Sequence, residues 1–564
     1  MRITAVHIEN FRGIRSLGLE LGRVTVLIGE NNSGKTSVLD ALRRCLQDLG
    51  HRRRVVFEAL DFHLPDTAAE PSTADPIKID VTFSDQPDEE WDDALVARLN
   101  RARVLQVDDD GRNHVRLRVE CQYEESTREF AQDWSFLDLN GGRLSRVPAR
   151  ALATLQDALR YYYLTALRDA GSHFSARGRF WRPFLNDSQL SPDRKNEIES
   201  RLQEVNDLVV SSHASFEQVR TGLRRVQSIV PLASGEAVSI EAVPGRMFDM
   251  LARAQVQLGT TTGAKIPLVR HGEGTQSLAV LMLFSAFLEA QKESAAVLAL
   301  EEPEAHLHPS AIRALWTLVG TFRGQQLIST HSGDLLAEVD VHDVRRLART
   351  PEGIKSFRVA PTVLSPEETR KFNYQIRRAR GALLFARCWL LVEGETETWI
   401  YPAAARALGL NLHAEGIRLV EFSQSDVGML AKIANALGIL WYCVGDDDAN
   451  RTKEEPKLRR HLEGAREADR FAFPYPDIEV NLLRNGYENV YGGHMSEQNL
   501  NKILKTHGEP GYWQDYAANL PRRAKTRAAA EVAIRMEGRG EAGVSPEIRE
   551  VLEKVVSLAR GDGP

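Results

Sequence analysis

Eight residues near the amino terminus have the types and spacing of a phosphate-binding loop. Residues 29–36 read Gly-Glu-Asn-Asn-Ser-Gly-Lys-Thr, which fits G-x-x-x-x-G-K-[ST], and they lie between the apolar run Val24–Ile28 and a helical pattern. In this context the backbone N–H groups of the loop face an anion, Lys35 reaches the terminal phosphates and Thr36 ligates Mg²⁺. The stretch therefore predicts a nucleoside triphosphate site formed by Gly29, Asn32, Ser33, Gly34, Lys35, Thr36 and Ser37.

Two acids and a histidine follow further strand patterns. The apolar run at residues 297–300 ends in Glu301 and Glu302, and the strand pattern at residues 326–332 contains His331. An acid at the end of a parallel strand beside a phosphate loop holds Mg²⁺, and the next acid polarises the attacking water. We therefore assign Glu301 to the metal and Glu302 to the water, with helix capping as the alternative. His331 is interpreted as a γ-phosphate sensor, against an ordinary satisfied polar residue.

A second set of acids follows two apolar runs in the carboxyl-terminal third. Glu393 closes the first run and Glu397 lies one helical turn later. The second run ends in Asp446, Asp447 and Asp448, of which the first and third point the same way on an extended segment. Four carboxylates at adjacent strand ends repel one another unless cations separate them, and an all-oxygen site favours Mg²⁺ or Mn²⁺ over zinc. An acidic surface loop is the alternative interpretation.

Composition limits the classes of protein to which the chain can belong. At 564 residues, with 43% hydrophobic and 27% charged residues, the sequence is typical of several globular domains. It has no apolar run that could span a bilayer and no signal-peptide core, and its four cysteines lack metal-ligand spacing. We therefore expect a cytoplasmic protein without membrane partners, disulfides or zinc. The net charge of −6 means that any nucleic-acid binding depends on local patches.

The elements that must position these residues form two α/β patterns separated by polar helical sequence. Residues 3–21 predict two strands around a turn, and residues 77–83 and 115–123 alternate as an antiparallel pair does. Residues 160–168 predict a strand ending in Arg168 and Asp169, which would reach the nucleotide or form a structural ion pair. The helical stretch at residues 185–255 is either an arm that pairs two protomers or a lid, and we favour dimerisation.

Together, the amino-terminal motifs resemble those of ATP-binding-cassette (ABC) ATPases of the SMC and recombination-repair type. The resemblance covers most of residues 1–350, with residues 29–36 as Walker A, residues 297–302 as Walker B and His331 as the H-loop. Glu301 stands where that family has aspartate. The resemblance implies ATP with one Mg²⁺ as the ligand of this domain.

The signature motif of the ABC family corresponds to residues 272–277 but departs from it. Gly272 replaces the family's serine, Glu273 replaces the first glycine, and Gly274 takes the place of the second glycine. The departure removes a hydroxyl group that family members use to touch the partner's γ-phosphate. By the resemblance, Gly274 still belongs to the nucleotide site.

The carboxyl-terminal acids resemble the fingerprint of a TOPRIM domain, which pairs a strand-end Glu-Gly with a later Asp-x-Asp. Here these are Glu393 with Gly394 and residues 446–448, within roughly residues 385–485. Glu397 points to the nuclease-type members, which hold two metal ions. An ABC-type ATPase joined to such a domain resembles the OLD (overcoming lysogenization defect) nucleases, a family that includes the nuclease component of the Gabija anti-phage system.

Two further residues enter through the resemblance to OLD nucleases. Glu479 would complete the second metal site, and Lys525 matches the family's catalytic lysine. A DNA-facing or solvated helix is the alternative for Lys525, because it lies in the basic run PRRAKTR. In the implied site, one ion of Mg²⁺ or Mn²⁺ is held by Glu393, Asp446 and Asp448, and the second by Glu397 and Glu479.

The expected fold is α/β, and the organisation follows from both resemblances. Residues 1–184 and 256–370 form an ABC-type ATPase domain, residues 185–255 a helical insertion, residues 385–510 a TOPRIM nuclease domain and residues 511–564 a helical segment. The expected function is a metal-dependent DNA endonuclease or nickase, regulated by ATP binding and hydrolysis, in anti-phage defence or DNA repair. Expected partners are DNA, a second copy of the chain and a helicase. An SMC-like DNA clamp without nuclease activity and an RNA-processing role are the alternatives.

Overall fold

The computed structural model describes two compact units. The first comprises Met1–Tyr163, Ala295–Glu301 and Gly324–Pro564, and the second comprises Leu164–Ser294 and Glu302–Arg323. The described residues are 1–49, 55–64, 69–87, 89–164, 191–212, 243, 257–259, 265–267, 270–290, 295–305, 307–379, 381–423, 425–462 and 469–561.

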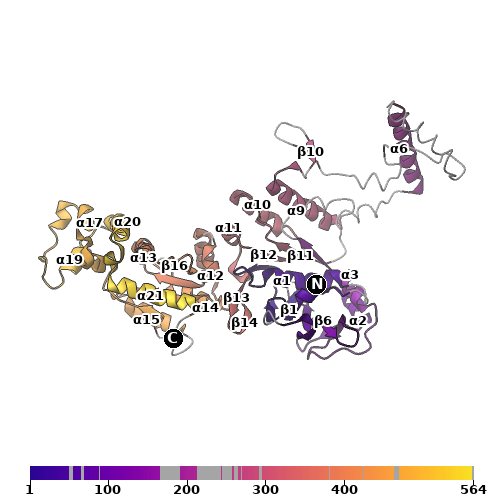
Figure 1. Cartoon of the computed structure of the whole chain (residues 1–564), viewed down its shortest axis with the longest axis horizontal. Coiled ribbons are helices and arrows are strands. Elements are labelled where there is room, and N and C mark those ends of the chain that lie inside the picture. Colours follow the sequence, from indigo (N-terminus) through magenta and orange to yellow (C-terminus); the bar gives the residue numbers. More distant parts are fainter. Residues whose placement is uncertain are drawn as a thin grey trace. The chain divides into compact units, whose positions relative to one another are not determined.

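A largely parallel sheet in the first unit carries the phosphate loop (Figure 1). Its strands, in spatial order, are β14 (Gly353–Phe357), β13 (Val344–Thr350), β3 (Val24–Ile28), β12 (Gln325–Ser329), β11 (Ala295–Glu301) and β8 (Leu159–Leu164). β3 pairs in parallel with β12 and β13, and β12 pairs in parallel with β11. Because parallel strands end at the same edge of a sheet, the loop after β3 and Glu301 lie at one edge.

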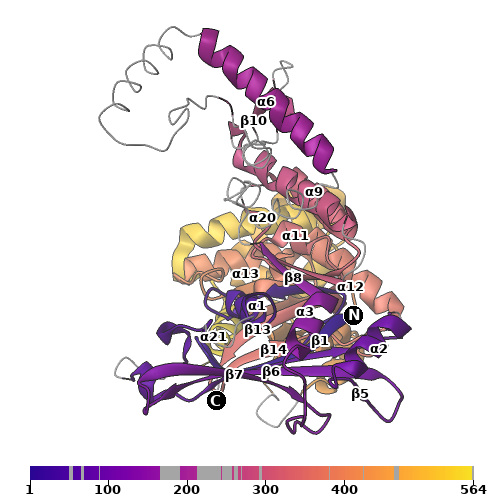
Figure 2. The same ribbon diagram turned by 90° about the vertical axis from the view of Figure 1, so that its right-hand side faces the viewer.

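An antiparallel sheet shares one hydrophobic core with the phosphate-loop sheet. Its path is β2–β1–β4–β6–β5, with β7 also paired to β6, and Figure 2 shows the long β6–β7 pair. The strands are β1 (Arg2–Phe11), β2 (Ile14–Glu20), β4 (Ile77–Ser84), β5 (Gln106–Val107), β6 (Asn113–Glu124) and β7 (Glu129–Leu137). Alternate residues of β4 and β6 are buried and pair directly, as Val81 does with Leu117. The predicted antiparallel layer is therefore confirmed.

Short helices connect the strands of these two sheets. They are α1 (Lys35–Arg43), α2 (Asp93–Arg101), α3 (Ala151–Ala158) and α11 (Gly333–Leu336), and α12 (Pro366–Arg378) leads from β14 to the next sheet. α1 starts directly at the end of the phosphate loop and buries Val38, Leu39 and Leu42. This burial fixes the helix whose amino terminus faces the loop.

A third, wholly parallel sheet lies in the carboxyl-terminal part of the first unit. Its order is β16 (Ile417–Glu421), β15 (Cys388–Val392), β17 (Leu440–Val444) and β18 (Phe471–Ala472). Its longer helices are α13 (Glu395–Ala407), α14 (Val427–Ala436), α15 (Arg451–Arg459), α20 (Arg522–Arg539) and α21 (Pro546–Arg560). Shorter ones are α16 (Ile478–Leu482), α17 (Glu488–Gly493), α18 (Glu497–Leu500) and α19 (Tyr512–Ala518). Side chains of α20 and α21 share one hydrophobic core with β15 and β17.

The second unit contains α6 (Pro192–Ser212), α9 (Glu273–Ala290), α10 (Pro309–Gly320) and the hairpin of β9 (Gln257–Gly259) and β10 (Lys265–Pro267). α6 confirms helical structure for that part of the predicted insertion. Most of its remaining residues lie outside the described part of the chain, as do Arg168 and Asp169. Among the described residues, every helix is too short or too polar to cross a membrane.

Candidate nucleotide and metal sites

The phosphate loop has a backbone that only glycine accommodates at two positions. Gly29 has φ 149° and Gly34 has φ 95°, and a Cβ atom on Gly29 would lie 2.2 Å from the carbonyl oxygen of Leu347. Lys35 Nζ donates to the carbonyl oxygens of Gly29 and Glu30, each at 2.8 Å. The loop is therefore compact around the lysine that the sequence assigned to the phosphates.

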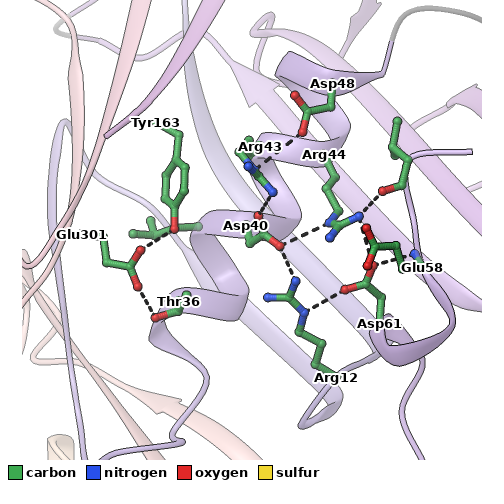
Figure 3. A network of polar contacts seen from close by, with 12 residues as sticks. Arg12, Thr36, Asp40, Arg43, Arg44, Asp48, Glu58, Asp61, Tyr163 and Glu301 are labelled. Carbon is green, nitrogen blue, oxygen red and sulfur yellow. Dashed lines mark hydrogen bonds and ion pairs between the residues drawn. The ribbon is translucent and has the colours of Figure 1, made fainter. Parts of the chain in front are cut away.

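Thr36 and Glu301 meet at the sheet edge beside the loop (Figure 3). Thr36 Oγ1 donates to Glu301 Oε1 at 2.5 Å, and the Tyr163 hydroxyl donates to Glu301 Oε2 at 2.6 Å. Burial, followed by the hydrogen bond to Glu301, raises the pKa of Tyr163 far above its usual value. Hydroxyl and carboxylate oxygens are the donor set that Mg²⁺ prefers, so these residues fit the metal of a Mg²⁺–nucleotide complex.

A buried ionic network holds the helix behind the loop (Figure 3). Arg12 Nη2 lies 2.6 Å from Asp40 Oδ2, and Arg12 Nε lies 2.9 Å from Asp61 Oδ1. Arg44 contacts the same two carboxylates at 3.2 and 3.0 Å. Because Asp40 belongs to α1 and Arg12 follows β1, the network joins the loop helix to the antiparallel sheet.

The other residues assigned to the nucleotide site lie on separate elements. His331 is exposed, two residues beyond the end of β12, so the strand is shorter than predicted. Glu302 has a positive φ of 44° at the start of a segment of the second unit, and Gly274 lies in α9 of that unit. Ser33 is buried, Ser37 is half-buried, and the two flank Lys35. The roles of these residues toward a nucleotide stay predictions.

The strand-end acids meet where the sequence predicted, at the carboxyl edge of the third sheet. Val392 of β15 pairs with Val444 of β17, so both strands end side by side. Asp446 N donates to Glu393 Oε2 at 3.2 Å, while Asp446 Oδ1 is buried with no hydrogen-bond partner among the described residues. Burial, then the nearby glutamates, raises the pKa of Asp446 to about 9. A buried carboxylate oxygen without a donor is a feature that a cation would satisfy.

Glu397 comes to this edge from the first turn of α13. Its Oε2 accepts from Gly394 N at 3.2 Å, and only 4% of the residue is exposed. Burial, with the charge of Glu393 as a further cause, raises the pKa of Glu397 to about 7. Burial likewise raises the pKa of Glu393, and Asp448 and Asp477 add to the rise.

A lysine and two more acids complete the same cluster. Lys525 Nζ, from α20, lies 3.0 Å from Glu479 Oε2 and 3.3 Å from Asp477 Oδ2. Thr396 Oγ1 donates to the other oxygen of Glu479 at 2.9 Å. Burial and the neighbouring Asp477 raise the pKa of Glu479 to about 8. Burial opposes the charge of Lys525, but the two acids outweigh it and raise the lysine pKa.

Asp446 and Asp448 do not share one environment, contrary to the prediction for an extended segment. Asp446 is half-buried, whereas Asp448 is exposed and accepts from Asn450 N at 2.7 Å and from its side-chain amide at 3.1 Å. The reason is that the chain turns after Asp446 rather than continuing as a strand. Asp447 does point elsewhere, to an ion pair with Arg451 at 2.8 Å.

These side chains gather without forming a finished metal site. In the described part of the chain, no three acidic, histidine or cysteine side chains are already arranged as a full ligand set. Asn450 engages Asp448, and Lys525 engages Glu479, so cation binding requires these carboxylates to rotate. The unpartnered oxygen of Asp446 and the all-carboxylate donor set fit Mg²⁺ or Mn²⁺.

Sequence reasoning missed several residues of these sites. Asp477 and Glu479 are two residues apart, as Asp446 and Asp448 are, so the spacing of acids in the sequence could have identified Asp477. Glu454 is another: burial and the charges of Glu393 and Asp448 raise its pKa to about 7. No sequence pattern marks Glu454, Thr396 or Tyr163, because each reaches its site through tertiary packing.

An α/β domain with a phosphate-binding loop, followed by a TOPRIM domain, is the class of protein that this fold and these sites define. Residues 1–382 match the family model described as "Protein of unknown function (DUF2813)", and residues 384–448 match "Overcoming lysogenization defect protein-like, TOPRIM domain". The chain belongs to the first family, and its carboxyl-terminal part contains an OLD-like TOPRIM domain. The predicted resemblance to the OLD family and the predicted fold class are confirmed.

Individual relatives agree with this assignment. "Uncharacterized protein YbjD" of Escherichia coli K12 is 31% identical, with all of both chains covered. "OLD nuclease" of Thermus scotoductus is 25% identical over 82% of this chain and 86% of its own length. "Endonuclease GajA" of Bacillus cereus is 23% identical over 80% of this chain and 76% of its own length. Two of these three relatives are named as nucleases.

Solved structures with similar parts include an SMC head bound to the winged-helix domain of ScpA. It has 15% identity and a TM-score of 0.37, and the alignment covers 64% of this chain and 99% of that chain. The carboxyl-terminal region of the Burkholderia pseudomallei OLD protein has 20% identity and a TM-score of 0.27. The alignment covers 31% of this chain and 99% of that chain.

Proposed function

We propose that this protein is a metal-dependent DNA endonuclease or nickase, regulated by an ATPase domain that binds and hydrolyses ATP. A role in anti-phage defence or DNA repair is part of the proposal, as are a homodimer and a helicase partner. The observation that carries it is the cluster of carboxylates beside Lys525, in which Asp446 keeps a buried oxygen that has no donor among the described residues. In an acidic surface loop, water would hydrate such an oxygen. In a cation-binding site, the oxygen is free to act as a metal ligand.

Each residue of the cluster has a part in the proposed reaction. Asp446, with Glu393 and Asp448, would hold one Mg²⁺ or Mn²⁺, and Glu397 with Glu479 would hold another. Bound cations would lower the pKa of the attacking water and neutralise the phosphodiester. Thr396 orients Glu479 through its hydroxyl, so that the carboxylate keeps one direction.

Lys525 supplies the positive charge of the proposed site. Its ammonium group lies beside Glu479, and once cations occupy the carboxylates it is available to a phosphate oxygen in the transition state. α13 and α20 both begin at the cluster, and helix amino termini favour bound anions. The amino ends of these helices would therefore help to hold the scissile strand.

Plasmid nicking tests the proposed metal site. We expect the parent to nick supercoiled DNA with Mg²⁺ or Mn²⁺, and Asp446→Asn to reduce the rate by at least about 100-fold, since a metal ligand is lost. Asp447→Asn is the matched control: this neighbouring acid pairs with Arg451 and should keep the parent's rate within about 2-fold, the small effect expected for an exposed pair. Nicking that persists in Asp446→Asn would contradict the metal assignment.

Lys35→Ala tests the nucleotide part of the proposal. We expect the substitution to abolish ATP hydrolysis and to change the effect of ATP on nicking. If ATP and Lys35→Ala both leave cleavage and DNA binding unchanged, the regulatory link is wrong. Absence of nicking under every metal and nucleotide condition would favour an SMC-like clamp, and preference for RNA in competition would favour RNA processing.

A further inference from the structure

An ion pair joins the phosphate loop to the beginning of the TOPRIM sheet. Arg387 Nε lies 2.5 Å from Glu30 Oε1, and Arg387 Nη2 lies 3.1 Å from Glu30 Oε2. The hydrogen bond from Arg387 lowers the pKa of Glu30, and the same bond raises the pKa of Arg387. About half of each side chain is exposed. Such surface pairs contribute little to stability, so the position of the pair is its informative property.

The backbone of Arg387 connects directly to the acid cluster. Its N–H donates to Gly416 O and its carbonyl accepts from Leu440 N, both at 2.9 Å, which sets the register of β15 against both neighbours. β15 is buried along its whole length and ends immediately before Glu393. Six residues of strand span about 20 Å. Because β15 is hydrogen-bonded on both sides, a displacement at Arg387 is carried toward Glu393 rather than absorbed.

A buried contact near this ion pair fixes the rest of the junction. Arg346 Nη1 donates to Gly438 O at 2.9 Å and Arg346 Nη2 donates to Ala386 O at 3.0 Å, with the arginine only 6% exposed. Arg346 pairs with Ile28, the residue before the phosphate loop. A Cβ atom on Gly438 would lie 2.6 Å from the Phe357 ring, so the two sheets are in close contact there.

Nucleotide binding acts on the loop at the residue that carries the ion pair. Lys35 donates to the carbonyl oxygen of Glu30, and a triphosphate in the loop competes for that ammonium group. We infer that Arg387 is a positioning residue that transmits the nucleotide state of the loop through β15 to Glu393. The contact stands independently, whereas its consequence for DNA cleavage rests on the proposed function.

The test compares Arg387→Met with Arg387→Lys in the full chain. Methionine keeps the aliphatic stem that packs on Gly416 but removes the charge, and lysine restores the charge. Arg406→Met is the matched control, because Arg406 forms an exposed ion pair with Glu537 at 2.6 Å within the TOPRIM part. Hydrogen exchange of residues 388–397 and plasmid nicking are measured with and without ATP, and with its non-hydrolysable imido analogue.

We expect nucleotide to change both readouts in the parent by at least about 5-fold, the lower end of usual allosteric couplings. In Arg387→Met this response should fall below about 2-fold. The affinity for ATP and the nicking rate in the absence of nucleotide should equal those of the parent. Arg387→Lys and Arg406→Met should keep the parent's response. The inference is overturned if Arg387→Met responds as the parent does, or if nucleotide leaves exchange of residues 388–397 unchanged in the parent. A parent that does not nick would contradict the proposed function, and the exchange measurements would still decide the inference.

Discussion

The two sites of this chain handle charge in opposite ways. At the phosphate loop, the charges are already matched: Lys35 contacts loop carbonyls, Glu301 accepts two hydroxyl hydrogen bonds, and Arg387 lowers the pKa of Glu30. At the acid cluster, one ammonium group faces many carboxylates, and burial raises the pKa of most of them. The cluster acids are Glu393, Glu397, Asp446, Asp448, Asp477 and Glu479.

This difference indicates what each site needs in order to work. The loop is preorganised, because its glycines and its lysine already surround the space for an anion. The acid cluster is not, since its buried carboxylates have raised pKa values and others bind Lys525 and Asn450 instead of a cation. We therefore expect nucleotide binding to keep the backbone shape of the loop while Lys35 exchanges its hydrogen bond to Glu30 O for one to a phosphate. We expect cation binding at the cluster to release protons and rotate side chains.

The test with the largest expected effect removes the positive charge of Lys525 from the cluster. We expect Lys525→Met to lower the nicking rate at saturating DNA by about 100-fold, the usual loss for one charge-stabilising donor. ATP hydrolysis should be unchanged, because Lys525 belongs to the acid cluster, where it contacts Glu479 and Asp477. Single-turnover nicking and steady-state ATPase assays measure the two effects.

Arg527→Met is the control for this substitution. Arg527 is exposed on the same helix, two residues along, and has no assigned role in the cluster. If Lys525 acts only as part of a DNA-facing helix, Lys525→Met should weaken DNA binding and reduce the salt dependence of that binding. The nicking rate at saturating DNA should then be unchanged. That outcome would contradict a catalytic role for Lys525.

Much of the fold was predictable because the strands are apolar, β-branched and short. The predicted strands around residues 24–28, 77–83, 115–123 and 389–392 all appear within a residue or two of their expected ends. The neighbouring positions of Glu393 and Asp446 were also predictable, because parallel strands end at one edge. Local pattern was sufficient wherever a residue follows its own strand directly.

The remainder of the sites depends on packing that sequence spacing does not encode. Tyr163 reaches Glu301 only because β8 lies beside β11. Lys525 was assigned by resemblance alone, and its distance to Glu479 depends on how α20 packs against the sheet. Such contacts join residues that are far apart in the chain.

The intermediate test uses the raised pKa of Asp446. Its folded pKa of about 9 lies above the unfolded value near 4, so the protonated carboxyl group favours folding below about pH 4 and this contribution is lost as pH rises toward 9. We expect the metal-free parent to lose at least about 1 kcal/mol of unfolding free energy between pH 5 and 9, or several degrees in Tm. Thermal unfolding in EDTA across this range measures it.

Asp446→Asn should flatten that pH dependence, because an amide group does not titrate. Mg²⁺ should stabilise the parent more at pH 9 than at pH 6, since it binds the ionised carboxylates, and should stabilise Asp446→Asn less. Asp447→Asn should keep the parent's pH profile, because the acid that it replaces is exposed. A parent whose stability rises with pH in EDTA would show that the cluster is already charge-compensated, and the contrast between the two sites would fail.

The smallest test concerns the preorganised site. Tyr163→Phe removes one of two hydrogen bonds to Glu301, but Thr36 still donates to the other oxygen. We expect ATP hydrolysis to fall only about 10-fold, or about 1.5 kcal/mol, the lower end for a hydrogen bond to a charged group, because Glu301 keeps its other hydrogen bond. Tyr161→Phe is the control, since its hydroxyl instead donates to Leu39 O in the core at 2.9 Å and should affect stability rather than Mg²⁺ dependence. A loss of 100-fold or more in Tyr163→Phe would mean that Glu301 has no fixed position without the tyrosine, and that the loop, like the acid cluster, is completed only by its ligand.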